Sequence, residues 1–118
     1  MSYDIYLTHP VTKKILEINE PHDIKGGTYA VGGTKDAWLN VTYNYGKHYY
    51  KTMGEKGIRT IYGMTGAESI PVLKDAIEKL GDDVVDDYWE ATEGNAKAAL
   101  YGLLALAQLR PDGIWDGD

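Results

Sequence analysis

The 118-residue chain contains no cysteine and no phenylalanine, and it has only three histidines. Without cysteine it forms no disulfide, has no thiol nucleophile and offers no cysteine-ligated zinc or iron–sulfur centre. The ten tyrosines and three tryptophans supply all the aromatic rings, so each ring carries a polar group that needs a partner when buried. Composition is otherwise that of an ordinary globular protein, and the length predicts one domain spanning residues 1–118.

The motifs that identify common enzyme classes are also missing. The sequence has no Gly-x-Ser-x-Gly elbow, no His-Glu-x-x-His, no phosphate-binding loop and no dinucleotide fingerprint. The histidines, at His9, His22 and His48, lack the paired spacing of a metal site, and the aspartates of residues 82–87 lack the pattern of a calcium loop. We therefore expect no catalytic residue, no metal and no cofactor. A small hydrolase using His48 or an aspartate as base is the weakest alternative.

Long hydrophobic runs and an excess of positive charge are absent as well. The longest apolar run, residues 98–107, is about half of what spans a bilayer, and no signal peptide precedes it, so we expect a cytoplasmic protein without a membrane partner. Net charge is −6, with a mildly basic first half and a strongly acidic second half. Duplex nucleic acid is therefore not expected as a partner, because phosphate binding needs clustered cations.

Period-two alternation predicts strands in the first half of the chain. Residues 4–18 are typical of a hairpin that turns at His9-Pro10, residues 28–31 between glycine pairs indicate a third strand or an extended segment, and residues 38–45 predict a fourth strand. In that last segment Leu39 and Val41 alternate with Asn40 and Thr42, so its two faces differ in polarity.

Helical patterns follow in the second half. A short helix is expected over residues 47–53, and residues 58–62 are too short to assign. A capping box at Thr65 begins a helix that stops at Gly81, and Pro71 within it predicts a kink or a restart at Ser69. A last helix, largely apolar, runs over residues 92–109. Strands before helices predict an α+β fold in which a small antiparallel sheet of three or four N-terminal strands packs against about three C-terminal helices.

The polar face of residues 38–45 and the cationic, tyrosine-rich segment after it form the candidate binding constellation. Uncharged amides and hydroxyls, cations and stackable rings together suit a phosphorylated, base-bearing ligand. The alternative interpretation is a solvated polar face beside tyrosines packed on the sheet, and Tyr43, Tyr45 and Tyr49 are expected in the core. The candidate ligand-binding residues are Asn40, Thr42, Asn44, Lys47, Tyr50, Arg59, Trp89, Thr92 and Asn95.

The expected helix starts at Thr65 and Thr92 are also candidates, because unpaired amides at a helix N-terminus bind anions. Capping is a sufficient structural explanation for both, since Glu68 and Glu93 are placed to fill these amides.

Three segments resemble one group of proteins. Residues 40–44 (NVTYN), 57–68 (GIRTIYGMTGAE) and 87–96 (DYWEATEGNA) resemble a group of small uncharacterised proteins from bacteria and their phages, and the resemblance extends over nearly the whole chain. It implies a stand-alone protein of phage or prophage type, a class that includes inhibitors of host defence and proteins that sequester signalling molecules. It brings no activity with it.

Two hypotheses of function follow. The first is a non-enzymatic binding protein with a pocket for a small polar or phosphorylated ligand, with a nucleotide-like molecule as the candidate. The second is a protein–protein inhibitor whose acidic second half mimics nucleic-acid charge and blocks a basic host protein. A second copy of the chain, giving a homo-oligomer, is a further candidate partner.

Overall fold

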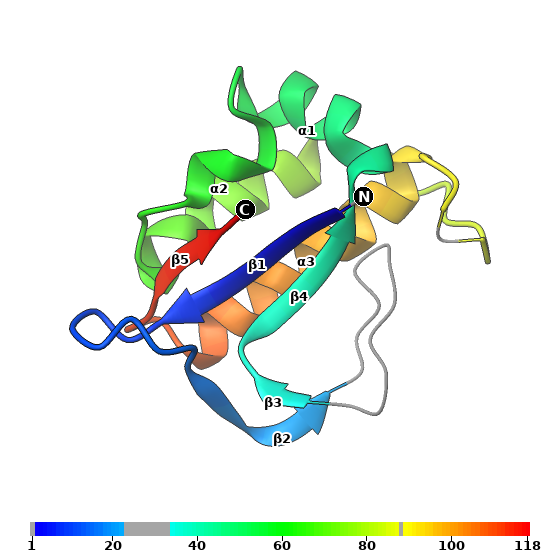
Figure 1. Ribbon diagram of the computed structural model, residues 1–118. Coiled ribbons are helices and arrows are strands. Elements are labelled where there is room, and N and C mark those ends of the chain that lie inside the picture. Colours follow the sequence, from blue (N-terminus) through cyan, green and yellow to red (C-terminus); the bar gives the residue numbers. More distant parts are fainter. Residues whose placement is uncertain (1, 23–33, 88) are drawn as a thin grey trace.

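The computed structural model describes residues 2–22, 34–87 and 89–118. It has an α+β fold with a three-stranded antiparallel sheet in the order β4-β1-β5 (Figure 1). The strands are β1 Ser2–Thr8, β4 Trp38–Thr42 and β5 Ile114–Gly117, and a second pair is formed by β2 Glu17–His22 and β3 Thr34–Asp36. The helices are α1 Gly46–Met53, α2 Gly66–Glu78 and α3 Glu93–Leu109, with two 3₁₀ turns, η1 Tyr43–Tyr45 and η2 Gly57–Ile61. In Figure 1, α3 crosses behind the three-stranded sheet, and β2 and β3 lie below it.

The core lies between this sheet and the helices. Along β1 the buried apolar residues are Tyr3, Ile5 and Leu7, whose Cα partners on the neighbouring strands are Val41, Leu39 and Trp115 respectively. Because side chains alternate along a strand, this register places all six residues on one face. Helix α3 covers that face with buried leucines and alanines, as its nearly uniform apolar pattern predicts, and Thr92 caps it through the amide of Asn95.

The fourth strand is shorter than predicted. It ends at Thr42, whose hydroxyl accepts a hydrogen bond from the amide of Asn44 at 3.3 Å, and Tyr43–Tyr45 forms a 3₁₀ turn. The prediction of a strand to residue 45 is wrong because the apolar alternation continues past the point where this cap turns the backbone. Asn44 therefore does not continue the strand face of Asn40 and Thr42.

The expected hairpin is only partly formed. A turn does follow β1, and Ile15 makes an isolated antiparallel bridge to Thr8, but β2 pairs with β3 rather than with β1. The strand expected over residues 28–31 lies outside the described residues. A strand that was not predicted, β5, takes the free edge of β1 instead.

Helix α2 begins with the predicted capping box, in which Thr65 and Glu68 each accept a hydrogen bond from the other's amide. The restart expected at Ser69 is wrong, since the helix is continuous through Pro71 and ends at Glu78. Ser69 is buried, and its hydroxyl donates to the carbonyl of Gly66 and accepts from the indole Nε1 of Trp115, both at 2.7 Å. No helix in the described ranges is long and apolar enough to cross a membrane.

The capping box predicts a specific dependence of stability on pH. The pKa of Glu68 is lowered because its carboxylate accepts hydrogen bonds from the Thr65 amide and hydroxyl. A pKa lowered by folding adds stability above the unfolded pKa of about 4.3, and this stability is lost as pH falls through the folded pKa. We expect Glu68→Gln, which retains an amide oxygen as acceptor, to weaken the acid dependence of the unfolding free energy between about pH 5 and pH 3. Denaturant titrations across that range that give the same dependence for both proteins would contradict this role of the carboxylate.

Candidate anion-binding site

A cavity of about 350 Å³ opens where β1, η1, α1 and η2 meet. Its lining residues are Tyr3, Tyr43, Gly46, Lys47, Tyr50 and Arg59. Three of these, Lys47, Tyr50 and Arg59, are among the candidates from the sequence. The cavity combines two cations with three phenol rings, which is the chemistry that the sequence indicated for a phosphorylated ligand.

Arg59 is held in place on one side of this cavity. Its guanidinium carbon lies 4.9 Å from the ring centroid of Tyr3 and 6.0 Å from that of Tyr43, and Nε donates to the main-chain oxygen of Asp118 at 2.8 Å. The two rings pack edge to face, with centroids 4.5 Å apart. Within the described residues, no aspartate or glutamate side chain forms an ion pair with Arg59. The side chain is thus oriented by stacking and by one hydrogen bond to a main-chain oxygen.

Tyr3 forms the base of the cavity. The residue is only 4% exposed, yet its hydroxyl reaches Gly46, where an added Cβ would lie 3.0 Å from the phenolic oxygen. Burial raises the pKa of Tyr3, and the neighbouring Tyr50 raises it further, while Arg59 acts in the opposite direction. The hydroxyl therefore remains protonated at neutral pH, with Tyr50 as a hydrogen-bonding neighbour.

Lys47 and Tyr50 come from α1, on the other side of the cavity. The ring of Tyr50 is 47% exposed and lies over two glycines: an added Cβ would come within 3.2 Å of it at Gly57 and 3.7 Å at Gly46. Gly57 also has a φ of +58°, a conformation that side chains disfavour. Lys47 is exposed and forms no ion pair within the described residues. An exposed ring and a second cation thus complete the cavity.

The candidates Asn40, Thr42 and Asn44 lie outside this cavity, and their side chains contact other residues of the protein. The amide nitrogen of Asn40 donates to the hydroxyl of Ser2 at 2.8 Å and to the carboxylate of Asp4, Thr42 is fully buried, and Asn44 donates to the carbonyl of Trp89 at 2.9 Å. None of the three candidates lines the cavity.

The candidates near the start of α3 hold a loop. Asn95 is buried, and its side-chain oxygen accepts from the amide of Val85 at 3.0 Å while its nitrogen donates to the carbonyls of Asp87 and Glu90. Thr92 caps the helix through the Asn95 amide. These contacts satisfy both ends of the Asn95 amide, so the side chain fastens Val85, Asp87 and Glu90 to α3.

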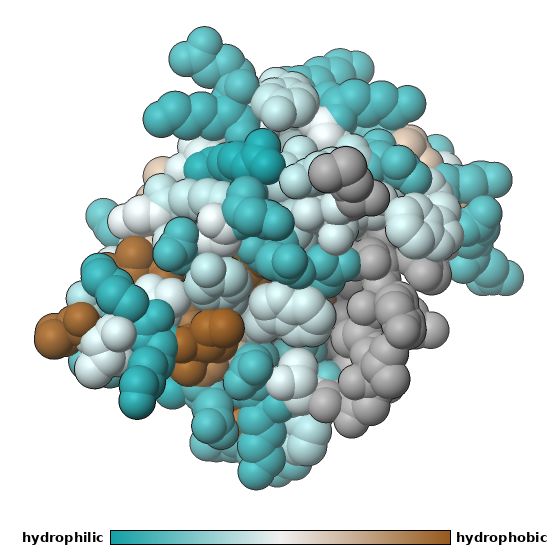
Figure 2. Space-filling model, in the orientation of Figure 1, coloured by the Kyte–Doolittle hydropathy of each residue, from teal (hydrophilic) through white to brown (hydrophobic). Residues whose placement is uncertain are grey.

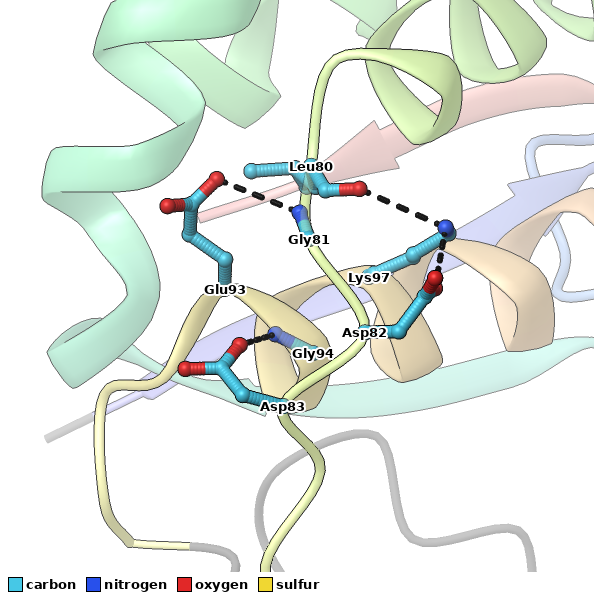
Figure 3. A network of polar contacts seen from close by, with 7 residues as sticks. All are labelled: Leu80, Gly81, Asp82, Asp83, Glu93, Gly94 and Lys97. Atoms are coloured by element: carbon cyan, nitrogen blue, oxygen red, sulfur yellow. Dashed lines mark hydrogen bonds and ion pairs between the residues drawn. The ribbon is translucent and has the colours of Figure 1, made fainter.

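Acidic side chains join the loop after α2 to the first turns of α3, where Asp83 and not Glu93 bonds to a helix amide (Figure 3). Asp83 accepts from the amide of Gly94 at 2.9 Å, Glu93 accepts from the amide of Gly81 at 3.2 Å, and Lys97 forms an ion pair with Asp82 at 2.6 Å. Negative groups at a helix N-terminus are stabilising, so part of the acidic segment has a structural role.

The start of α2 is filled in the same way. Its first amides donate to the chain itself: Gly66 to the carbonyl of Gly113, Ala67 to that of Pro111, and Glu68 to the Thr65 hydroxyl. The two helix N-termini considered as anion sites are therefore capped from within. Among the described residues, no group of three or more acidic or histidine side chains is arranged to hold a metal ion.

Comparisons of the chain with protein-family models, with curated proteins and with solved structures each gave no match. The resemblance to small phage and bacterial proteins therefore remains a prediction, and the assignment of function rests on the residues of the site.

Proposed function

We propose that this protein is a non-enzymatic binding protein whose cavity at Tyr3, Lys47, Tyr50 and Arg59 takes a small anionic ligand with a flat ring, of the nucleoside monophosphate class. The observation that carries the proposal is the convergence of two cations on a cavity lined by tyrosines, where no acidic side chain of the described residues forms an ion pair with either cation. Each cation is able to make a charge-assisted hydrogen bond to phosphate, worth about 1.5–3 kcal/mol.

The fixed position of Arg59 favours binding over a merely solvated charge. Stacking on Tyr3 and the bond from Nε to Asp118 already restrict the side chain, so less conformational entropy is lost when its terminal nitrogens meet a phosphate. The exposed ring of Tyr50 offers a face on which a base stacks, which adds about 1–3 kcal/mol. The proposed role is sequestration of such a ligand, with no bond made or broken, as in phage proteins that capture a signalling molecule to evade host defence.

Isothermal titration calorimetry with adenosine monophosphate, adenosine and ribose 5-phosphate tests the proposal. We expect the nucleotide to bind at least tenfold more tightly than either fragment, because each fragment lacks one of the two recognised groups. Arg59→Gln, which retains a hydrogen-bonding amide, and Lys47→Gln are each expected to weaken nucleotide binding at least tenfold, about 1.4 kcal/mol. Lys74→Gln serves as the matched control, because Lys74 is an exposed α2 lysine that forms no ion pair with any residue the structure describes.

Two outcomes would count against the proposal. One is the absence of measurable heat from the nucleotide at millimolar concentration. The other is binding that Arg59→Gln and Lys47→Gln leave as tight as the Lys74→Gln control does.

A further inference from the structure

A second cavity, of about 470 Å³, lies between the start of β2 and the end of α3. Its lining residues are Glu17, Ile18, Asn19, Glu20, Leu109 and Arg110. Ile18 and Leu109 give it apolar walls, and Leu109 is 60% exposed. Because this apolar wall is exposed to water, the cavity suits a hydrophobic occupant.

The charge of this cavity is negative. Arg110 is fully engaged: Nε and Nη2 donate to the carboxylate of Asp112, at 3.2 and 3.0 Å, and Nη1 donates to the main-chain oxygen of Glu17 at 2.8 Å. The arginine accordingly lowers the pKa of Asp112. Glu17 and Glu20, by contrast, form no ion pair within the described residues. An occupant with an apolar tip and flanking positive charge would match both features.

The turn between β1 and β2 has the complementary chemistry. At its tip Val11 is 81% exposed, and Lys13 and Lys14 are exposed and without ion pairs in the described part of the chain. This loop projects from the body of the molecule in Figure 1, and hydrophobic side chains gather over it and the nearby start of β5 in Figure 2. One loop thus presents an apolar residue beside two free cations.

Hydrogen bonds within the turn also fix its conformation. The ring Nδ1 of His9 accepts hydrogen bonds from the amides of Val11 and Thr12, at 3.1 and 3.2 Å, and the His9 amide and carbonyl bond to Lys14 and Lys13. Lys13 adopts a φ of +64°, which costs energy in a residue with a side chain. A preordered loop loses little entropy on docking.

We propose that a second copy of this chain docks here, with the Val11 turn of each copy in the Glu17/Leu109 cavity of the other. Val11 then packs against Ile18 and Leu109, and Lys13 and Lys14 face Glu17 and Glu20. Two such contacts related by a twofold axis close a dimer. Within one copy these groups do not meet, because Val11 is exposed and no ion pair joins the lysines to the glutamates. The contact is small and charged, so the dimer is weak and sensitive to salt.

Charge reversal tested by sedimentation velocity decides this proposal. We expect wild-type protein at low ionic strength to shift from monomer to dimer as concentration rises, and the shift to be lost in Lys13→Glu/Lys14→Glu and in Glu17→Lys/Glu20→Lys. An equimolar mixture of the two variants is expected to dimerise again, with affinity at least tenfold above either variant alone. Lys74→Glu and Glu78→Lys, on exposed positions of α2, are the matched controls and should behave as wild type.

A mixture that stays monomeric would overturn the proposal, as would wild-type protein that remains monomeric at millimolar concentration. Val11→Asp, at a position exposed enough to tolerate a charge, gives an independent readout and is expected to abolish dimerisation. Circular dichroism confirms that each variant is folded. The proposal does not depend on the anion site, so titration of the same variants with adenosine monophosphate separates the two.

Discussion

Replacement of Trp115 by alanine is expected to lower the free energy of unfolding by about 3–5 kcal/mol, the usual cost of removing a buried tryptophan. Trp115 lies in β5 on the core face, is among the largest fully buried side chains, and donates from its indole nitrogen to Ser69. The substitution leaves a cavity and also removes a hydrogen-bond partner from the buried Ser69 hydroxyl. Denaturant unfolding followed by far-ultraviolet circular dichroism measures the loss.

A surface aromatic residue provides the control for this prediction. Tyr101→Ala, on the exposed side of α3, is expected to change stability by no more than about 0.5 kcal/mol. Combining Trp115→Phe with Ser69→Ala in a double-mutant cycle isolates the hydrogen bond, for which we expect a coupling of about 1 kcal/mol. A loss of unfolding free energy below about 1.5 kcal/mol for Trp115→Ala would show that Trp115 of β5 is not packed in the core as described.

Replacement of Gly94 by alanine is expected to destabilise the protein by about 1–3 kcal/mol, although alanine is the better helix former by about 1 kcal/mol. An added Cβ would lie 2.4 Å from the main-chain nitrogen of Val84 and 2.6 Å from the carbonyl carbon of Asp83. Both atoms belong to the backbone, so the whole loop must shift and release the Asp83 and Asn95 hydrogen bonds. Denaturant unfolding gives the free energy, and faster exchange of the Val85 amide reports loosening of the loop.

Gly81→Ala is the matched control. Gly81 lies in the loop that Gly94 packs against, and a Cβ added at Gly81 would meet nothing closer than 3.8 Å. This substitution should leave both the stability and the exchange of the Val85 amide nearly unchanged. If Gly94→Ala instead stabilised the protein, as helix propensity alone predicts, the close packing of this loop against α3 would be wrong.

The parts of the fold that depend on local signals could be predicted from the sequence. The capping box at Thr65 and the apolar run before Pro111 fixed two helices, because caps and periodicity act within a few residues. Strand β5 could not be found this way, since only four residues form it and its pairing joins positions more than 100 residues apart. The end of β4 was misplaced because Tyr43 and Tyr45 extend an alternation that the backbone no longer follows.

Part of the candidate cavity could be predicted for the same reason. Lys47, Tyr50 and Arg59 lie within thirteen residues and converge on one cavity, whereas Tyr3 joins them only through the pairing of β1 with β4. The pairing of Tyr3 with Val41 of β4, had it been predicted, would have added Tyr3 to the candidate residues. Asn95 has the chemistry of a ligand-binding amide, but nothing in its local sequence reveals that a loop ten residues earlier satisfies it.

The absence of phenylalanine has a visible consequence in the core. Tyr49 is fully buried, and its hydroxyl donates to the carbonyl of Ala96 at 2.9 Å. Burial raises the pKa of Tyr49 well above its usual value, so this donor stays protonated. The Tyr49 bond joins α1 to α3, and the bond from Trp115 to Ser69 joins β5 to α2. Polar groups on buried rings therefore add directional hydrogen bonds to the apolar packing between these elements.

We propose that adenosine monophosphate, as the probe for the ligand class, binds in the cavity formed by Tyr3, Lys47, Tyr50 and Arg59. Nitrogen–proton correlation spectra recorded during a titration test it most directly, because they locate the ligand as well as detect it. We expect saturable shifts of the Arg59 Nε–H signal and of the Gly46 and Lys47 amides, with little change along α2. Saturating nucleotide that leaves these signals in place, or moves signals on another face instead, would contradict the account.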